Sequence, residues 1–213
     1  MKPRRTILSL VAVALAILPV TPSASAAGSV PKPARFTLSS GLPVLFIERH
    51  DLPIVSLQLV LRTGAVADPA DKAGLASLTA DLLTKGTPSR TANEISAELD
   101  FVGGSLSSGS DQDRTTLQLD VLKKDFGLGL DLFADSLVHP AFKVDELDRE
   151  RQQREAGLKS SLDDANRVID MASNASTYGR DKAYGRLSSG TQASLPGITQ
   201  ADLLSVCVGP DMD

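Results

Sequence analysis

The chain contains very few of the side chains that small secreted proteins and metal sites depend on. It has one cysteine, two histidines, no tryptophan and 4% aromatic residues. The single Cys207 cannot form an intrachain disulfide, and no Cys/His cluster is present for a structural metal. With 26 acidic and 22 basic residues, the chain also has no basic excess that would attract nucleic acid or anionic lipid. We therefore expect no nucleic-acid partner and a core built mainly from Leu, Val and Ala.

The N-terminus has the pattern of an export signal. A basic stretch at residues 1–5 precedes an apolar stretch at residues 6–20, and Ala24-Ser25-Ala26 supplies a small-x-small cleavage pattern. The apolar stretch is shorter than the ~20 residues that span a bilayer. We predict a signal peptide at 1–26, an extended leader at 27–34 and one domain at 35–213. This predicts a periplasmic or secreted bacterial protein with no membrane anchor after cleavage.

Strand patterns and helix patterns alternate in the rest of the chain. Residues 35–38 and 42–48 flank a Ser-Ser-Gly turn and predict a hairpin. Residues 55–62 alternate apolar and polar as a third strand, and 105–110 with 114–122 predict a second hairpin. Predicted helices cover residues 91–102, 126–138, 145–162, 166–177 and 199–206, in addition to one that begins near residue 75. The predicted fold class is α+β, with a mostly antiparallel sheet covered by helices on one side.

Two of these predicted helices carry specific expectations about their faces. The helix at 126–138 has Phe126, Leu130, Phe133 and Leu137 at helical spacing, and His139-Pro140 ends it. The charged helix at 145–162 has three acid-first pairs at i,i+4, the favourable order for an exposed helix. These pairs are Asp145/Arg149, Glu150/Arg154 and Glu155/Lys159.

Residues 74–87 read Gly-Leu-Ala-Ser-Leu-Thr-Ala-Asp-Leu-Leu-Thr-Lys-Gly-Thr. This segment resembles the zinc-binding helix of the pitrilysin/insulinase family of metallopeptidases. Its frame, Gly-x-Ala before and Lys-Gly-Thr after, encloses the motif His-x-x-Glu-His in active members. Two His at i and i+4 lie on one helix face and can reach one zinc ion, and the Glu is placed to activate a bound water. Here the three positions are Ser77, Ala80 and Asp81.

The resemblance extends over residues 35–206 as an ordered series of short matches. They include Leu52-Pro53, Asp68-Pro69, Gly103-Gly104, Pro140-Ala141-Phe142, Glu150-Arg151 and Tyr184-Gly185-Arg186. The resemblance implies a domain like those of mitochondrial processing peptidase and LuxS-like metallohydrolases. It also implies a third zinc ligand, a Glu on the later charged helix, whose position is occupied by Gly157. Glu155 is the nearest carboxylate, but at a spacing of two it lies on a different helix face.

Other chemistry at these positions has weaker support from the sequence. Ser77, Asp81 and His139 are the residue types of a hydrolytic triad, but His139 adjoins a helix-ending Pro and nothing positions it near Ser77. The simpler interpretation is that Ser77 and Asp81 lie on the wetter side of a helix whose opposite face is apolar. One carboxylate alone does not form a cation site.

The resemblance therefore implies an exported non-catalytic pitrilysin-like peptidase homologue. Such a protein would need no cofactor and would bind peptides or complete the chamber of a catalytic pitrilysin-like partner subunit. One alternative is an active zinc metalloendopeptidase with unconventional ligands, and only this alternative requires zinc. The other is a truncated, non-functional fragment, because family members continue past residue 206 into a closing strand and a second domain. We accordingly expect the domain at 35–213 to be truncated at its C-terminal end.

Overall fold

The computed structural model describes residues 32–207, so the predicted signal peptide, most of the leader and residues 208–213 lie outside the described residues. The described residues divide into two compact units, with the boundary between His50 and Asp51, and we describe the units separately. Among residues 32–207, no helix is both long and apolar enough to span a bilayer.

The first unit contains the predicted hairpin. Strands β1 (Ala34–Thr37) and β2 (Pro43–Phe46) pair antiparallel, with Ala34 opposite Phe46. The amide of Leu38 donates a hydrogen bond of 2.9 Å to the carbonyl of Leu42 and closes the turn. The Ser-Ser-Gly signal therefore located both strands correctly.

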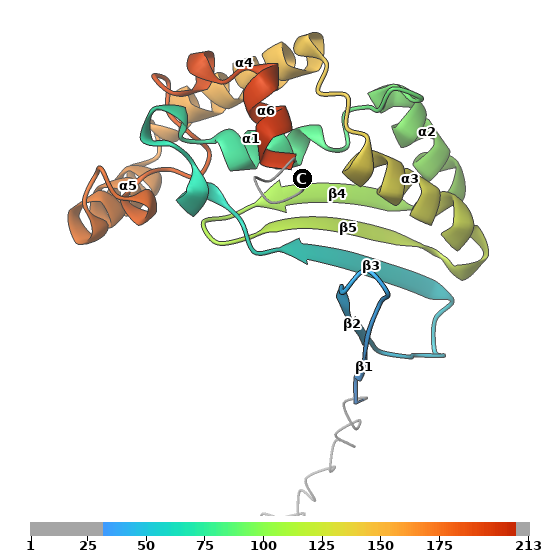
Figure 1. Cartoon of the computed structure of the whole chain (residues 1–213). Coiled ribbons are helices and arrows are strands. Elements are labelled where there is room, and N and C mark those ends of the chain that lie inside the picture. The colour runs from blue at the N-terminus through green and yellow to red at the C-terminus, as the bar shows by residue number, and fades with distance from the viewer. Residues whose placement is uncertain (1–31, 208–213) are drawn as a thin grey trace, which may run out of the picture. The chain divides into compact units, whose positions relative to one another are not determined.

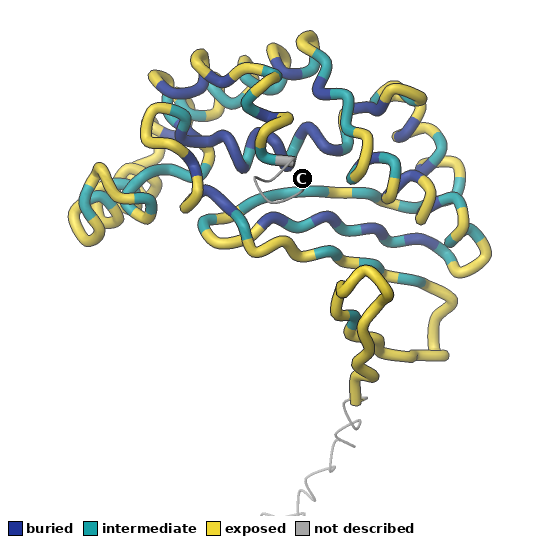
Figure 2. The backbone as a smooth tube through the Cα atoms, in the orientation of Figure 1, coloured by how far each residue is buried: buried dark blue, intermediate teal, exposed yellow. Residues whose placement is uncertain are grey.

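The second unit is built on a three-stranded antiparallel sheet (Figure 1). Its strands are β3 (Ile54–Leu61), β4 (Ser105–Ser110) and β5 (Thr115–Leu122), in the order β3-β5-β4. Along β5 the burial alternates residue by residue, with Leu117, Leu119 and Val121 buried (Figure 2). This period of two is the one expected for a strand with one face on a core. The described helices of this unit lie over that face only (Figure 1).

The helices of the second unit match the predicted ones within a few residues. They are α1 (Leu75–Leu82), α2 (Ala92–Val102), α3 (Phe126–Val138), α4 (Val144–Ser161), α5 (Ala165–Tyr178) and α6 (Gln200–Cys207). Short 3-10 turns connect them: η1 (Ala65–Ala67), η2 (Ala70–Lys72), η3 (Lys123–Asp125), η4 (Ala183–Gly185) and η5 (Leu195–Gly197). The α+β class and the helix-covered antiparallel sheet are thus confirmed.

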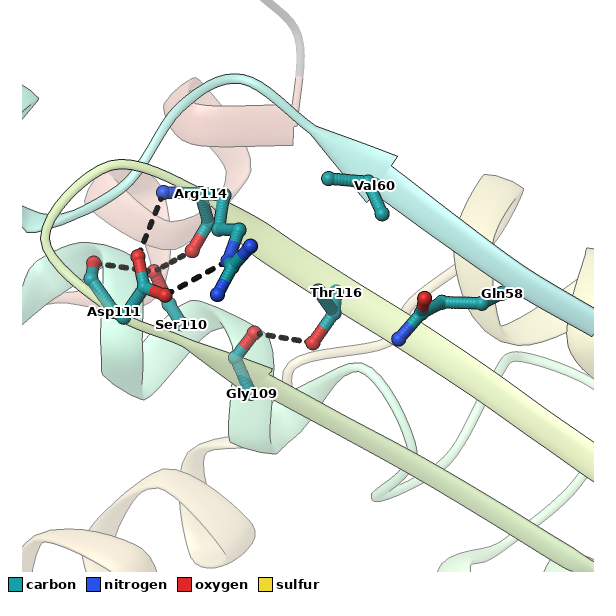
Figure 3. A pocket seen from close by; sticks show the side chains of 7 residues that line it. All are labelled: Gln58, Val60, Gly109, Ser110, Asp111, Arg114 and Thr116. Carbon is teal, nitrogen blue, oxygen red and sulfur yellow. Dashed lines mark hydrogen bonds and ion pairs between the residues drawn. The ribbon is translucent and has the colours of Figure 1, made fainter. Parts of the chain in front are cut away.

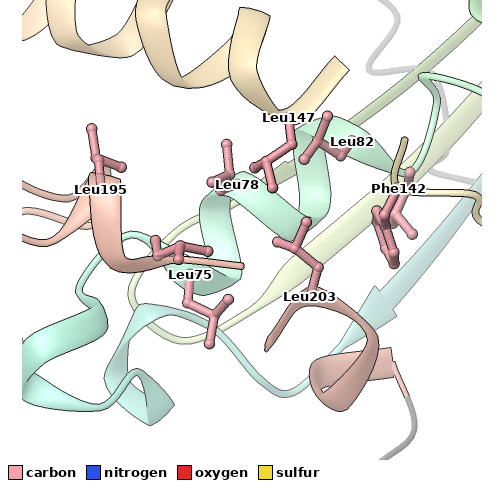
Figure 4. Close-up of a cluster of buried hydrophobic side chains, with 9 residues drawn as sticks. Leu75, Leu78, Leu82, Phe142, Leu147, Leu195 and Leu203 are labelled. Carbon is pink, nitrogen blue, oxygen red and sulfur yellow. The ribbon is translucent and has the colours of Figure 1, made fainter. Parts of the chain in front are cut away.

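Two clusters of buried side chains hold the layers together. One lies between the sheet and helices α2 and α3, and comprises Ile95, Leu99, Leu117, Leu119, Val121, Leu132 and Phe133. The other surrounds α1 and includes Leu75, Leu78, Leu82, Phe142, Leu147, Leu195 and Leu203 (Figure 4). The second cluster draws side chains from α1, α4 and α6, so it fixes α1 between helices that are distant in sequence.

The predicted apolar face of α3 was only partly right. Leu130 is exposed, whereas Leu132 and Phe133 are buried. Gly129 faces the sheet, where a Cβ would lie 2.9 Å from Val121 Cγ1. This glycine lets α3 approach β5 closely. The buried face of the helix therefore contains Gly129, Leu132 and Phe133 and does not contain Leu130.

Candidate functional site

Helix α1 carries the candidate site and is held at its N-terminus by Asp68. The Asp68 carboxylate accepts hydrogen bonds from the amides of Gly74 and Ala76, both at 2.9 Å. These amides belong to the first turn, whose N–H groups have no partner within the helix. Burial raises the pKa of the Asp68 carboxyl, and these amide hydrogen bonds oppose that rise. Arg186 also donates to the Asp68 backbone carbonyl at 3.0 Å.

The three motif positions on α1 have different environments. Ser77 and Asp81 are only partly buried and lie one turn apart, as predicted for the wetter side of the helix. Ala80 is completely buried, and its carbonyl accepts a hydrogen bond of 2.6 Å from the Ser108 hydroxyl on β4. Ala80, which the family resemblance assigns to the position of the catalytic base, therefore serves packing in this chain.

The guanidinium of Arg154 on α4 binds both partly buried positions. Its Nη1 donates to Ser77 Oγ at 3.1 Å, and its Nη2 donates to the Ser77 carbonyl at 3.0 Å. The same Nη2 forms an ion pair with the Asp81 carboxylate. Nε lies 3.4 Å from Glu150 Oε1, so the pair predicted one turn apart on α4 is present. Arg154 therefore joins α1 to α4 through the candidate site.

Burial makes this cluster more than a surface ion pair. Only 9% of the Arg154 side chain and 15% of the Glu150 side chain are exposed, compared with 36% for Asp81. Burial raises the pKa of the Asp81 carboxyl, the Glu150 charge raises it further, and the Arg154 charge opposes both effects. The guanidinium therefore compensates two neighbouring carboxylates that would otherwise repel each other.

Our expectation that α4 is an exposed, ion-paired helix was wrong for Arg154. Arg149 also pairs with Glu146 at 3.0 Å instead of with Asp145. The positions of two leucines could have indicated that Arg154 is buried. Leu147 lies seven residues before Arg154, and Leu158 lies four residues after it. Residues at such spacings share a helix face. Because most residues of α4 are charged or polar, the sequence pattern indicated an exposed helix and not this buried face.

Gly157 lies one turn beyond Arg154 on α4. A Cβ at this position would meet no atom within 4 Å. Gly157 and Arg154 line an open cavity of about 400 Å³, to which α5 contributes Met171 and Asn174. No side chain at the third-ligand position reaches toward α1.

The residues at these positions do not fit a zinc ion. Catalytic zinc requires three protein ligands, usually His nitrogen or carboxylate oxygen. Within residues 32–207, no three His, Cys, Asp or Glu side chains gather closely enough to hold a metal ion. Asp81 already pairs with a cation, and the neighbouring Ser77 hydroxyl interacts with the same guanidinium.

The alternative hydrolytic triad is not supported by the geometry. His139 Nδ1 lies 3.4 Å from Asp135 Oδ1 on its own segment, and the imidazole is mostly exposed. The Ser77 hydroxyl interacts with Arg154, which is always protonated in proteins and cannot act as a base. Ser77 therefore has no described partner that would activate it as a nucleophile.

A second cavity, of about 340 Å³, lies on the sheet face that the described helices leave open (Figure 3). Gln58, Gly109 and Thr116 line it from the three strands. Its charged groups are Arg114 and Asp111, whose Nε and Oδ2 atoms are 2.9 Å apart. These groups neutralise each other, so the cavity offers no activated nucleophile or base.

The fold and the position of α1 beside α4 define the class of protein. An antiparallel sheet, a short buried helix bearing the motif positions and a long second helix beside it agree with the metallopeptidase domain that the sequence resemblance implies. Residues 44–188 match the family described as Insulinase (Peptidase family M16). The chain belongs to peptidase family M16.

Relatives in this family come from several bacteria. The chain is 30% identical over 171 residues to an uncharacterized zinc protease of Mycobacterium leprae, with 80% of this chain and 38% of the relative covered. It is 25% identical over 168 residues to an uncharacterized zinc protease of Rickettsia felis, with 79% and 40% covered. The chain thus spans about two fifths of the length of these relatives.

Solved structures agree with the family assignment. A Pseudomonas fluorescens protein described as a peptidase M16 inactive domain superposes with a TM-score of 0.78 at 26% identity, covering 82% of this chain and 42% of that one. A protease from Helicobacter pylori superposes with a TM-score of 0.71 at 21% identity, covering 81% of this chain and 42% of that one. The second likeness concerns the fold alone.

Proposed function

We propose that the chain is a non-catalytic M16 domain that binds extended peptides or completes the substrate chamber of a catalytic M16 subunit. The observation that carries this proposal is the Arg154 guanidinium between Ser77 and Asp81, where a hydrolytic site would need a metal and a base. The likeness to the P. fluorescens inactive domain supports the non-catalytic part of the proposal. The relatives named zinc proteases make an active enzyme the alternative to be tested.

The sheet of the second unit supports the peptide-binding part of the proposal. In the described sheet, β3 and β4 are the edge strands, and β4 lies beside α1. An extended peptide can bind a protein by adding a strand to such an edge, with backbone hydrogen bonds providing affinity. This mode of binding needs no metal and no nucleophile.

The N-terminal sequence supports export as a further part of the proposal. We propose that residues 1–26 direct the chain to the periplasm or the exterior and are removed there. Fractionation of cells that express the full chain, followed by N-terminal sequencing of the exported product, tests this. A product that retains residue 1 in the cytoplasm would contradict it.

Metal analysis and a proteolysis assay on the purified full-length product test the central proposal. We expect no stoichiometric zinc, no cleavage of unstructured peptides, and measurable binding of such peptides by fluorescence anisotropy. A matched peptide with alternate N-methylated amides should bind more weakly, because it cannot complete the strand ladder. Stoichiometric zinc together with chelator-sensitive cleavage would establish the active enzyme instead.

The partner role has its own test. Co-expression with a catalytic M16 subunit from the same cell should yield a complex whose peptidase activity exceeds that of the catalytic subunit alone. A catalytic subunit that is fully active alone and does not associate with this chain would exclude the chamber-completing role, leaving peptide binding as the function.

A further inference from the structure

The Arg154 cluster occupies the place where zinc coordination would join two helices. The family resemblance places two ligands on α1 and one on α4. In this chain the same helices are joined by one guanidinium, which contacts Ser77 and Asp81 on α1 from its position on α4. We infer that Arg154 is an internal cation that substitutes for the metal, linking α1 to α4 and excluding divalent ions from the site.

The contacts of Arg154 match this linking role. Three of its nitrogens take part: Nη1 and Nη2 contact α1, and Nε contacts Glu150. A planar guanidinium presents several donors in a rigid fork and remains charged at all physiological pH values. A lysine would offer a similar charge but could not reach the hydroxyl, the carbonyl and the carboxylate with the same fixed geometry. Arg154 is thus a positioning residue for α1.

The position of the guanidinium, and not the net charge of the cluster, explains why a divalent ion would be excluded. Asp81 and Glu150 supply two negative charges, and Arg154 already supplies one positive charge beside them. A metal bound on the Ser77 and Asp81 face would lie within a few ångströms of the guanidinium, and like charges at that distance repel strongly in a partly buried site. Replacing the missing ligands should therefore be insufficient to restore zinc binding while Arg154 remains.

Two ligand-restored proteins test the exclusion directly. Both carry Ser77→His, Asp81→His and Gly157→Glu in the full chain, and one also carries Arg154→Met. We expect the Arg154→Met protein to bind Zn²⁺ at least about 100-fold more tightly in calorimetric titration, because the repulsive charge is gone. Zinc should also raise its Tm, since the metal would then link α1 to α4.

Arg149→Met in the same ligand-restored background is the matched control. Arg149 lies on the same helix, but its side chain is 67% exposed and pairs with Glu146. This control should leave zinc affinity unchanged. Equal zinc affinity with and without Arg154 would overturn the inference.

A double-mutant cycle between Asp81 and Arg154 tests whether Arg154 links α1 to α4, and it does not require the restored zinc ligands. Asp81→Asn should lower the Tm in the otherwise unaltered chain, and this loss should be at least halved in an Arg154→Met background. Equal losses in the two backgrounds would show that Arg154 does not hold α1, even if the ligand-restored proteins fail to fold. These readouts do not depend on whether the chain binds peptides.

Discussion

The Ser108 hydroxyl donates a hydrogen bond of 2.6 Å to the carbonyl of Ala80, and this contact ties β4 to α1. Ala80 lies in the last turn of α1, where its carbonyl also accepts a hydrogen bond of 3.1 Å from the Leu83 amide that caps the helix. The Ser108 contact is therefore a second hydrogen bond to this carbonyl, and it fixes the helix that bears the motif positions against the edge strand of the sheet.

Ser108→Ala should destabilise the second unit by about 0.5–1 kcal/mol, because the Ala80 carbonyl loses one of its two hydrogen bonds and keeps the one from the Leu83 amide. Denaturant unfolding monitored by circular dichroism measures this change. Ser107→Ala is the matched control, since Ser107 is the neighbouring residue on β4 and is exposed on the opposite face. Equal effects of the two substitutions would show that the Ser108 contact contributes nothing.

Asp68→Ala should cost about 1–2 kcal/mol of stability, because the amides of Gly74 and Ala76 would lose their shared acceptor. The loss should appear as faster hydrogen exchange at these two amides as well as a lower Tm. Asp71→Ala changes an exposed acid three residues away and should have little effect. Unchanged exchange in Asp68→Ala would contradict the capping role.

Asp202 should make the stability of the chain depend on pH in the acid range. Its hydrogen bond from Lys72, together with the Thr199 amide, lowers its pKa from 3.8 to about 2. A carboxyl with a lower pKa in the folded state stabilises the protein above its unfolded pKa, and this contribution is lost as the pH falls from about 4 toward 2. Because solvent reaches the pair, we expect a contribution of about 1 kcal/mol at neutral pH.

Asp202→Asn tests this expectation through urea unfolding at pH 7 and pH 2.5. The substitution should lower the free energy of unfolding at pH 7, and the difference from the unsubstituted chain should shrink at pH 2.5. A difference that is the same at both pH values would show that ionisation of Asp202 does not stabilise the fold.

Gly157→Ala should raise stability by up to about 1 kcal/mol, because alanine favours the helix interior and the added methyl group meets nothing within 4 Å. Thermal unfolding measures the gain. Gly74→Ala provides the contrast: φ there is +97°, and a Cβ would lie 2.7 Å from the Gly190 Cα. This second substitution should lower the Tm, and a stabilising effect would contradict the close packing of α1.

Local patterns were sufficient to predict most of the secondary structure. Helix α2 begins after Thr91 with a reciprocal pair of hydrogen bonds between Thr91 and Glu94, and ends at Gly103 in the left-handed conformation. Both signals depend on residues within a few positions of each other. The buried face of α3 could not be derived in this way, because it depends on how closely Gly129 approaches β5.

The sequence also predicts degenerate motif positions, through the family resemblance, since a zinc ligand needs a particular side chain at a particular place in that motif, and this stays a prediction. The order of strands and helices followed from periodicity and turn signals for the same reason: each is a property of neighbouring residues. Only the tertiary structure decided what lies at the candidate site. Arg154 and Asp81 are 73 residues apart and meet because buried leucines hold α4 against α1. No local sequence pattern specifies this contact between Arg154 and Asp81. The presence of the Arg154 guanidinium at the candidate site could therefore be recognised only in the folded chain.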